Sequence, residues 1–141
     1  MKVKLDEGAF LPERAHPTDA GLDLRTPIDF VCPSWLCFWK PKAVIDTRVH
    51  IAIPEGHVGF LKSKSGLNVK NDLTGEGVID AGYTGSIVVK LYNFSWRNRK
   101  FKRGDKVIQL VILPILTPEL ERVDELADTE RGSGGFGSTG R

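Results

Sequence analysis

Short apolar or alternating runs separated by turn-forming residues dominate this chain of 141 residues. Alternation of apolar and polar side chains is typical of strands that bury one face against a core. The pattern predicts strands at 2–5, 28–31, 43–46, 49–53, 58–62, 86–92 and 106–115. One helical turn is expected at 65–70, with Ser63 or Ser65 as its N-cap. The sequence therefore predicts an all-β protein.

Turn-forming residues and a change of composition mark the organisation of the chain. Pro-Glu-Gly-His at 54–57 and Asp-Ala-Gly-Tyr at 80–83 lie between consecutive apolar runs and are predicted to form hairpin turns. After about residue 116 the sequence becomes acidic and polar, and it ends in glycine-rich residues. We expect a β domain at 1–116, a polar connector at 117–130 and a mobile tail at 131–141.

The glycine-rich tail carries one aromatic ring, on Phe136, and guanidinium groups on Arg131 and Arg141. Ordering such a segment costs about 1–2 kcal/mol per residue in backbone entropy, and the tail has little apolar surface to offset that cost. The ring is suited to stacking on a flat base, and a guanidinium to pairing with phosphate oxygens. Two interpretations stay open at this point: a lid over a nucleotide, and a frayed terminus.

Composition narrows the class of protein. The 20 Lys and Arg against 18 Asp and Glu give a net charge of only +2, and the basic residues are scattered apart from a run at 97–103, so a nucleic-acid polymer is not indicated as a partner. No apolar run approaches the roughly 20 residues that a membrane span needs, and no signal peptide is recognisable. Cys32 and Cys37 without a second pair make a zinc site improbable and fit a reducing cytoplasm.

An apolar segment at 32–39, Cys-Pro-Ser-Trp-Leu-Cys-Phe-Trp, concentrates two of the three tryptophans. A contiguous apolar surface of this kind is usually covered. We therefore expect a contact in the core or between subunits, in preference to a binding patch for an outside partner.

Several polar residues are candidates for chemistry. Asp80 follows an apolar pair and opens a turn, where a carboxylate could act as a general base or simply form the turn. Tyr83, in the same turn, suits contact with a sugar or partial burial in a strand. Lys64 lies in a Ser- and Lys-rich turn that suits phosphate binding or plain solvation. Gln109 either contacts phosphate or faces outward, and Asp19 and Asp23 are carboxylates of the kind that hold hydrated Mg²⁺, or parts of a turn.

Taken in order, these segments resemble the trimeric dUTP pyrophosphatase (dUTPase) family, whose five short motifs spread over nearly the whole chain. The matching segments are Asp-Ala-Gly-Leu-Asp-Leu at 19–24, Lys-Ser-Gly-Leu at 64–67, Gly-Val-Ile-Asp-Ala-Gly-Tyr-Thr-Gly at 77–85 with its continuation to Asn93, Arg-Gly-Asp-Lys-Val-Ile-Gln at 103–109, and Arg-Gly-Ser-Gly-Gly-Phe-Gly-Ser-Thr-Gly at 131–140. The resemblance implies a distorted β-barrel or jelly-roll, assembled as a homotrimer with shared active sites and a flexible C-terminal tail.

The resemblance also implies an activity, the hydrolysis of dUTP to dUMP and pyrophosphate. This reaction limits uracil incorporation into DNA and supplies dUMP for thymidylate synthesis. By motif position, Asp80 would activate the attacking water and Tyr83 would pack on the deoxyribose. The backbone near Val78 and Ile79 would read uracil, with Thr74 at a position that is often Asn in relatives.

The remaining roles that the resemblance implies concern the triphosphate. The expected phosphate contacts are Lys64, Ser65, Gly66 and Gln109. Asp23 would hold Mg²⁺ through water. From the tail, Phe136 would cover the uracil while Arg131, Gly137 and Ser138 would bind the outer phosphates. Lys64 stands where the family usually has Arg, so a two-pronged fork is replaced by a single point charge.

Two rival functions remain at this stage. A dCTP deaminase has a similar fold and assembly, but that branch places a catalytic Glu where this chain has Lys90, and a cation cannot serve as that acid and base. The other rival is a nucleotide-binding regulatory protein that kept the pocket and uses the apolar segment at 32–39 as its contact surface.

Overall fold

The computed structural model describes residues 1–37 and 40–134, and within them it is built almost entirely of strands. The elements in chain order are β1 (Val3–Leu5), β2 (Gly21–Arg25), β3 (Phe30–Cys32), β4 (Lys42–Asp46), β5 (Val49–Ile51), β6 (His57–Lys62), α1 (Ser65–Asn71), β7 (Leu73–Thr74), β8 (Glu76–Ile79), β9 (Val88–Asn93), β10 (Arg99–Phe101) and β11 (Lys106–Pro114). The all-β prediction is confirmed. The short α1 lacks the length and apolar character that a membrane-spanning helix requires.

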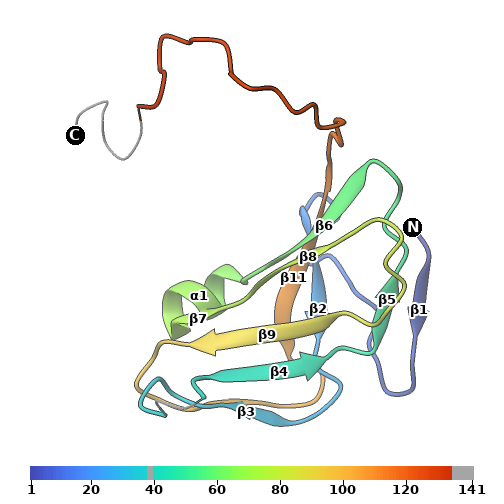
Figure 1. Ribbon diagram of the computed structural model, residues 1–141. Helices are drawn as coiled ribbons and strands as arrows, with labels where there is room; N and C mark the ends of the chain where they lie inside the picture. The colour runs from blue at the N-terminus through green and yellow to red at the C-terminus, as the bar shows by residue number, and fades with distance from the viewer. Residues whose placement is uncertain (38–39, 135–141) are drawn as a thin grey trace.

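The strands form four antiparallel sheets around one core (Figure 1). The largest has the order β2-β11-β6-β8, a second has the order β4-β9-β7, and β1-β5 and β10-β3 form two-stranded pairs. Side chains from the two larger sheets meet between them, including the fully buried Leu24, Leu91, Ile108 and Leu110. Burying each such side chain contributes about 1.5–3 kcal/mol. The described strands thus surround the core as open sheets and do not form a closed barrel.

Strict alternation explains why β9 was predictable. Val89, Leu91 and Asn93 point into the core, whereas Val88 and Tyr92 on the other face are exposed. The buried amide of Asn93 is satisfied, because it donates to the carbonyls of Cys32 and Arg97, at 3.0 Å each. A buried polar side chain with partners avoids the desolvation penalty that an unpaired one would carry.

Turns form at 54–57 and 80–83, with backbone bonds from His57 N–H to the Pro54 carbonyl and from Tyr83 N–H to the Asp80 carbonyl, but neither is a hairpin turn as predicted, because β5 does not pair with β6 and β8 does not pair with β9. The predicted N-cap is wrong. Lys64 occupies that position without a side-chain cap, because the hydroxyl of Ser63 bonds instead to Thr74 at 3.0 Å and accepts from Gly75 N–H at 2.9 Å.

Short strands account for most of the differences from the prediction. The strand expected at 28–31 begins two residues later, as β3, and β2, β7, β8 and β10 were not predicted. These elements have two to five residues each, too few for a reliable period. The leucines of β2 point into the core: Leu24 is fully buried and Leu22 is 9% exposed.

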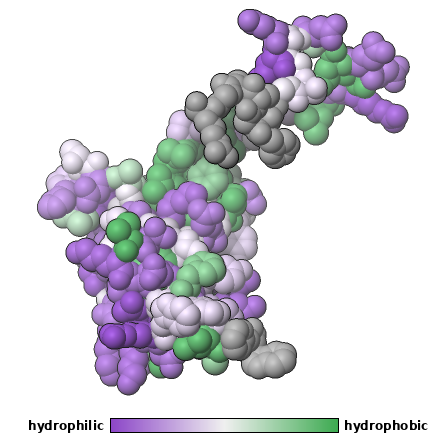
Figure 2. All heavy atoms as spheres, turned by 90° about the vertical axis from the view of Figure 1, so that its left-hand side faces the viewer, coloured by the Kyte–Doolittle hydropathy of each residue, from purple (hydrophilic) through white to green (hydrophobic). Residues whose placement is uncertain are grey.

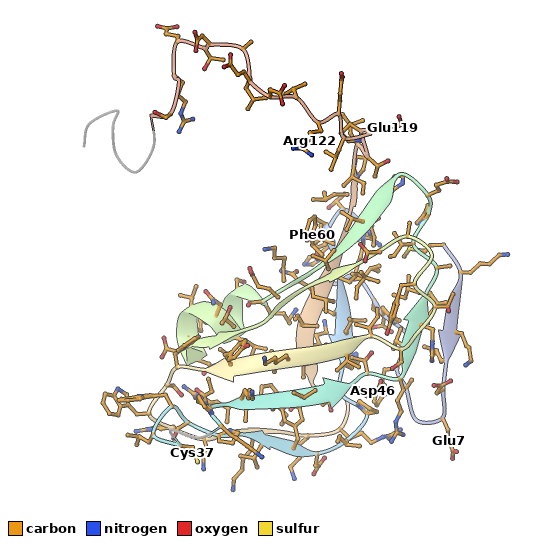
Figure 3. All side chains as sticks on the ribbon, in the orientation of Figure 1. Glu7, Cys37, Asp46, Phe60, Glu119 and Arg122 are labelled. Carbon is orange, nitrogen blue, oxygen red and sulfur yellow. The ribbon has the colours of Figure 1, made fainter. Side chains whose placement is uncertain are left out.

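The described part of the segment 32–39 is divided between core and surface. Cys32 is buried, Trp35 packs edge-on against Trp96 with ring centroids 4.6 Å apart, and Leu36 and Cys37 are exposed (Figure 3). Trp96, the partner of Trp35, is itself 67% exposed. A contact of this aromatic pair with another subunit therefore stays a prediction.

The chain after β11 leaves the folded body. Residues 117–134 include no strand or helix and are almost fully exposed, and Figures 1 and 2 show this segment projecting away from the sheets. Glu119 and Arg122 lie beyond the end at which β6 begins, on the side of His57 (Figure 3). The apolar Leu116, Leu120 and Leu126 are each more than four-fifths exposed, so no residue in the described part of the chain covers them.

Candidate active site

A polar pocket of ≈ 290 Å³ lies where β2, β11 and the end of β6 meet. Asp19, Asp23, Lys64 and Gln109 line it together with small and apolar residues. Strand register explains this gathering, since Gln109 of β11 pairs with Asp23 on one side and with Lys62 on the other. Three of the motifs identified in the sequence therefore supply one pocket.

Asp23 is the electrostatic centre of the pocket. Its side chain is 5% exposed and contacts two ammonium groups, Lys106 at 2.7 Å and Lys64 in an ion pair and hydrogen bond. Burial by itself would raise the pKa of Asp23, but the hydrogen bonds from Lys106 and Lys64 outweigh it and lower the pKa below its ordinary value. Asp23 and its two ammonium partners together carry one positive charge in excess, which the Asp19 carboxylate on the pocket wall balances, so an anion is attracted locally by the Lys64 ammonium and not by a net charge of the pocket.

Lys106 is a second ion-pair partner of Asp23 that the sequence analysis missed. In a regular strand, Lys106 and Gln109 would face opposite sides, because they are an odd number of residues apart. A register shift between Lys106 and Ile108 in the pairing with β2 brings both to the same side. The signal for this register shift is the pair of adjacent apolar residues Val107 and Ile108. Both are buried, and two consecutive buried positions break the alternation of a regular strand.

The other expected phosphate contacts surround the start of α1. Ser65 and Gly66 are exposed in its first turn. Gln109 is half-buried and donates from Nε2 to the Ser63 carbonyl at 3.2 Å. Its side chain lies over Gly21, where an added Cβ would come within 2.3 Å of the Gln109 Oε1, so Gly21 provides the space that Gln109 occupies.

A second cluster lies on the segment between β8 and β9. Asp80 is exposed just after β8, and Gly82 in the same turn has φ +88°, a conformation that glycine adopts without strain. The hydroxyl of Tyr83 donates to the Ser86 carbonyl at 3.1 Å, which fixes the ring beside the turn. The cluster thus presents a carboxylate and an aromatic ring to solvent.

The strands on either side of this turn do not pair with each other. β8 pairs with β6, and β9 pairs with β4 along its whole length but with β7 only at Asn93 and Tyr92. The unpaired edges of β8, including Val78 and Ile79, and of the first half of β9 therefore face each other. Free backbone N–H and C=O groups on two neighbouring edges are suited to hydrogen bonding with a flat heterocycle. Thr74 borders this region and bonds to Ser63.

The two clusters lie at opposite ends of β6 within one chain (Figure 1). Ile79 pairs with Gly59, so Asp80 lies level with Val58, whereas Gln109 pairs with Lys62. The four steps of strand from 58 to 62 correspond to about 13 Å. A carboxylate must approach within hydrogen-bond reach of the water that it activates. The structure does not bring Asp80 to the phosphate pocket of its own chain.

The tail residues expected at the site are only partly described. Arg131 is exposed and its Nε donates to the Gly134 carbonyl at 3.0 Å, at a distance from both clusters along the projecting segment. Phe136, Gly137 and Ser138 lie outside the described residues.

Comparison with known proteins decides the family. The dUTPase family model matches residues 7–140. The chain belongs to the dUTPase family. It is 44% identical over 138 residues to the deoxyuridine 5'-triphosphate nucleotidohydrolase of Arabidopsis thaliana, covering 97% of this chain and 80% of the relative. Identity to the rat protein of the same name is also 44%, over 99% of this chain and 66% of the relative.

Solved dUTPase structures have the same fold as this chain. The Staphylococcus bacteriophage 80alpha dUTPase with dUpNHpp has a TM-score of 0.84 and 37% identity, with 99% of this chain and 98% of the phage chain covered. A dUTPase mutant from phage phi11 of S. aureus, described with a structural Mg(II) ion, has a TM-score of 0.79 and 36% identity over 90% of this chain and 98% of that chain. The human and Dictyostelium discoideum relatives are named as mitochondrial.

Proposed function

We propose that this chain hydrolyses dUTP to dUMP and pyrophosphate. A water oxygen attacks the α-phosphorus, the bond from that phosphorus to the oxygen bridging to the β-phosphorus breaks, and pyrophosphate leaves. Asp80 takes the proton of the attacking water. The observation that carries this proposal is the pairing of a polar pocket that contains Asp23 and the Lys64 ammonium with a separate Asp80 and Tyr83 turn, in a chain that matches the dUTPase family from residue 7 to 140.

Recognition of the nucleotide divides between the two clusters. Lys64, Gln109 and the backbone at Ser65 and Gly66 bind phosphate oxygens, and the ammonium group of Lys64 supplies the positive charge. Tyr83 packs against the deoxyribose, where an added 2′-hydroxyl would clash.

The base itself is read at the free strand edges. The backbone at Val78 and Ile79 bonds to the edge of uracil, and Thr74 borders the base. The thymine methyl is rejected by the small width of the slot, and cytosine by mismatched donors.

Mg²⁺ fits this pocket as a partner of the triphosphate. Among the described residues no group of three or more His, Cys, Asp or Glu side chains is placed to hold a metal ion, and the one buried carboxylate already contacts two ammonium groups. A bare cation is therefore disfavoured, whereas Mg²⁺ carried by phosphates needs only water-mediated contact with Asp23. When bound, the ion offsets negative charge that develops on the phosphate oxygens.

The separation of about 13 Å along β6 supports an active site shared between copies of the chain. We propose a homotrimer in which the Asp80 turn of one copy meets the Asp23 pocket of another. The projecting segment 117–134 carries the tail to a neighbouring site, where Arg131, Gly137 and Ser138 bind the outer phosphates and Phe136 covers the base. The division into a β domain at 1–116, a connector at 117–130 and a lid at 131–141 is part of this proposal.

The free thiols of Cys32 and Cys37 fit a reducing compartment, and we propose the cytoplasm.

Deamination of dCTP is disfavoured because Lys90 stands where the deaminases have their catalytic Glu, and a cation cannot serve as that acid and base. The ammonium group of Lys90 lies 4.8 Å from the centroid of the Tyr92 ring.

A parallel assay tests the function. Pyrophosphate release is measured from dUTP, dTTP, dCTP and UTP, with and without Mg²⁺, together with ammonia release from dCTP. We expect pyrophosphate from dUTP alone, and more of it with Mg²⁺. Binding of dUTP without pyrophosphate release would instead indicate a regulatory nucleotide-binding protein, and ammonia would indicate a deaminase.

A mixing experiment tests the shared site. Asp80→Asn chains and Lys64→Ala chains, each inactive alone, are unfolded and refolded together. If each site combines the Asp80 turn of one copy with the pocket of another, mixed assemblies contain some sites with both residues intact and recover activity. No recovery, in mixtures shown by light scattering to be assembled, would place both residues in the site of one chain.

A further inference from the structure

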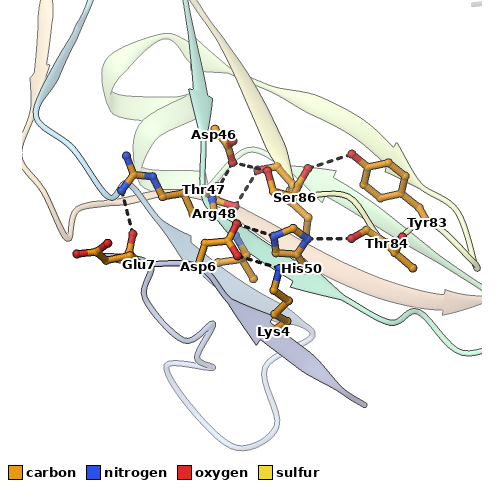
Figure 4. A network of polar contacts seen from close by, with 12 residues as sticks. Lys4, Asp6, Glu7, Asp46, Thr47, Arg48, His50, Tyr83, Thr84 and Ser86 are labelled. Atoms are coloured by element: carbon orange, nitrogen blue, oxygen red, sulfur yellow. Dashed lines mark hydrogen bonds and ion pairs between the residues drawn. The ribbon is translucent and has the colours of Figure 1, made fainter.

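The turn that carries Asp80 and Tyr83 is fastened to the rest of the chain by a polar network that centres on His50 (Figure 4). His50 lies in β5, opposite Lys4 of β1, and its side chain is 17% exposed. Its Nε2 lies 2.9 Å from Oδ2 of Asp6, and its Nδ1 lies 2.8 Å from the carbonyl oxygen of Thr84, the residue after Tyr83.

Both partners of the His50 ring are hydrogen-bond acceptors. A carbonyl oxygen only accepts, and an ionised carboxylate only accepts. Asp6 is ionised at neutral pH, because hydrogen bonds from His50 and Lys4 lower its pKa. A neutral imidazole has a single N–H and can satisfy one of the two partners, whereas the imidazolium satisfies both. The observed geometry therefore requires the protonated ring.

The same segment is held from a second side. Ser86 bonds through its hydroxyl to Asp46, whose Oδ1 also accepts from Arg48 N–H at 2.8 Å. Ile87 exchanges backbone bonds with Thr47 and Val49. The contacts at 86 and 87 involve β4, β5 and their connection and do not depend on histidine. Only the contact at Thr84, next to Tyr83, depends on the charge state of His50.

We propose that His50 is a positioning residue for nucleotide binding, which holds the Tyr83 turn in its binding conformation only while both ring nitrogens carry hydrogen. The inference rests on the proposed function, because it assigns the turn to nucleotide recognition. As the pH rises and the ring loses one N–H, either the Thr84 carbonyl or the Asp6 carboxylate loses its donor, and the turn gains freedom. His50 acts through Thr84 on Tyr83 and does not itself take part in the chemistry.

The charged groups around the ring act in opposite directions. The hydrogen bonds to Asp6 and Thr84 raise the pKa of His50, while Lys4 on the paired strand lowers it. Lys2 and Tyr83 line the same cavity of ≈ 240 Å³ beside the ring. Asp46 and Arg48 belong to the same network across Ser86. The net effect keeps the imidazolium to higher pH than for an isolated histidine.

The test measures the binding of dUpNHpp and the KM and kcat for dUTP. Each is measured at about pH 6 and at about pH 9, on either side of the range in which histidine titrates. The proteins are the full chain, His50→Gln, and His57→Gln as a matched control, since within the described residues the hydrogen bond of the His57 ring is a local one, to the carbonyl of Glu55. Protonation changes of the nucleotide itself are common to all three proteins, so the comparison between the two variants isolates His50.

We expect the wild type and His57→Gln to bind dUpNHpp about three- to tenfold more weakly at the higher pH, the equivalent of one ordinary hydrogen bond, with KM rising in parallel. His50→Gln should bind weakly at both values, while kcat stays within about twofold of wild type. Asp6→Asn, which keeps the ring but removes its counter-charge, should lose affinity at a lower pH than the wild type does. Equal pH dependence in His50→Gln and His57→Gln overturns the proposal.

A nuclear magnetic resonance titration of the imidazole nitrogens separates this inference from the proposed function. At about pH 6, His50 should show hydrogen on both nitrogens. Amide exchange at 83–85 should quicken as the ring deprotonates in the wild type, and should be fast at all pH values in His50→Gln. If the protein releases no pyrophosphate from dUTP, the proposed function is refuted, but the titration and the amide exchange still test the contact between His50 and Thr84. A protein that hydrolyses dUTP but shows a single N–H on His50 refutes only the positioning role.

Discussion

Individual aspartates in this protein differ in whether they are free to accept a proton, because their burial and ion-pair partners differ. Asp23 is buried between two ammonium groups, which fix its charge and geometry, while Asp80 is exposed in a turn without such partners among the described residues. Asp6 and Asp46 are held in the network around His50 and Ser86. A carboxylate free of ion pairs is the one available to accept a proton from water, which supports Asp80 as the base.

Replacing Asp80 with Asn should separate binding from catalysis. The amide keeps the shape of the side chain but cannot take a proton, so we expect turnover of dUTP to fall by roughly three orders of magnitude or more while dUpNHpp binding stays nearly unchanged. Asp72→Asn is the matched control, because Asp72 is exposed at the end of α1 with φ +53°, which Asn tolerates. Near-normal turnover in Asp80→Asn would rule out the assigned base.

His50 should also contribute a pH-dependent part of the stability. Its folded pKa is raised, mainly by the hydrogen bond to Asp6, so the contribution is fully present below about pH 6.5, the unfolded value, and is lost as the pH rises through the folded pKa. His50→Gln should therefore lower the Tm below about pH 6.5 more than at about pH 9. Scanning calorimetry of this variant and His57→Gln checks it. An equal loss at both pH values would contradict the assignment.

At the scale of the elements, small irregularities shape the site more than the regular strands do. The register shift in β11 turns Lys106 toward Asp23, and the lack of pairing between β8 and β9 leaves two backbone edges free. Gly75 lies between β7 and β8 and allows this junction to approach β9 closely. A Cβ there would lie 2.7 Å from the Lys90 carbonyl and 3.1 Å from Leu91 Cδ2.

Gly75→Ala should destabilise the fold because the Cβ would meet backbone that cannot rotate away. We expect a loss of about 1–3 kcal/mol in the free energy of unfolding, measured by urea denaturation. Gly66→Ala is the control, since no atom lies within 4 Å of its added Cβ in α1, and alanine favours a helix over glycine by up to about 1 kcal/mol. Equal stability of Gly75→Ala and wild type would show that the junction of β7 and β8 can move away from β9 without cost.

At the scale of the whole molecule, the chain is a folded body whose two candidate clusters lie apart. The Asp80 turn and the Asp23 pocket lie at opposite ends of β6, and the segment after β11 extends into solvent with exposed leucines. A second and third copy would supply what each chain lacks. Assembly is therefore expected to be a condition of activity.

Removing residues 131–141 should abolish most dUTP hydrolysis without weakening the fold. The described residues of that segment make no contact with the sheets, so we expect the Tm to change by less than about 3 °C. Calorimetry, light scattering and pyrophosphate release on the shortened chain check stability, assembly and activity separately. A sharply lower Tm would show that the tail packs as part of the folded body.

The sequence by itself determined the all-β class, the turns at 54–57 and 80–83 and the motifs that identify the family, because each depends on neighbours within a few residues. Only the tertiary structure decided that Lys106 joins Asp23, that Ser63 bonds across to Thr74, and that His50 contacts both Asp6 and Thr84. These contacts join strands far apart in the chain, and local periodicity carries no information on which strands pair or where a register shifts.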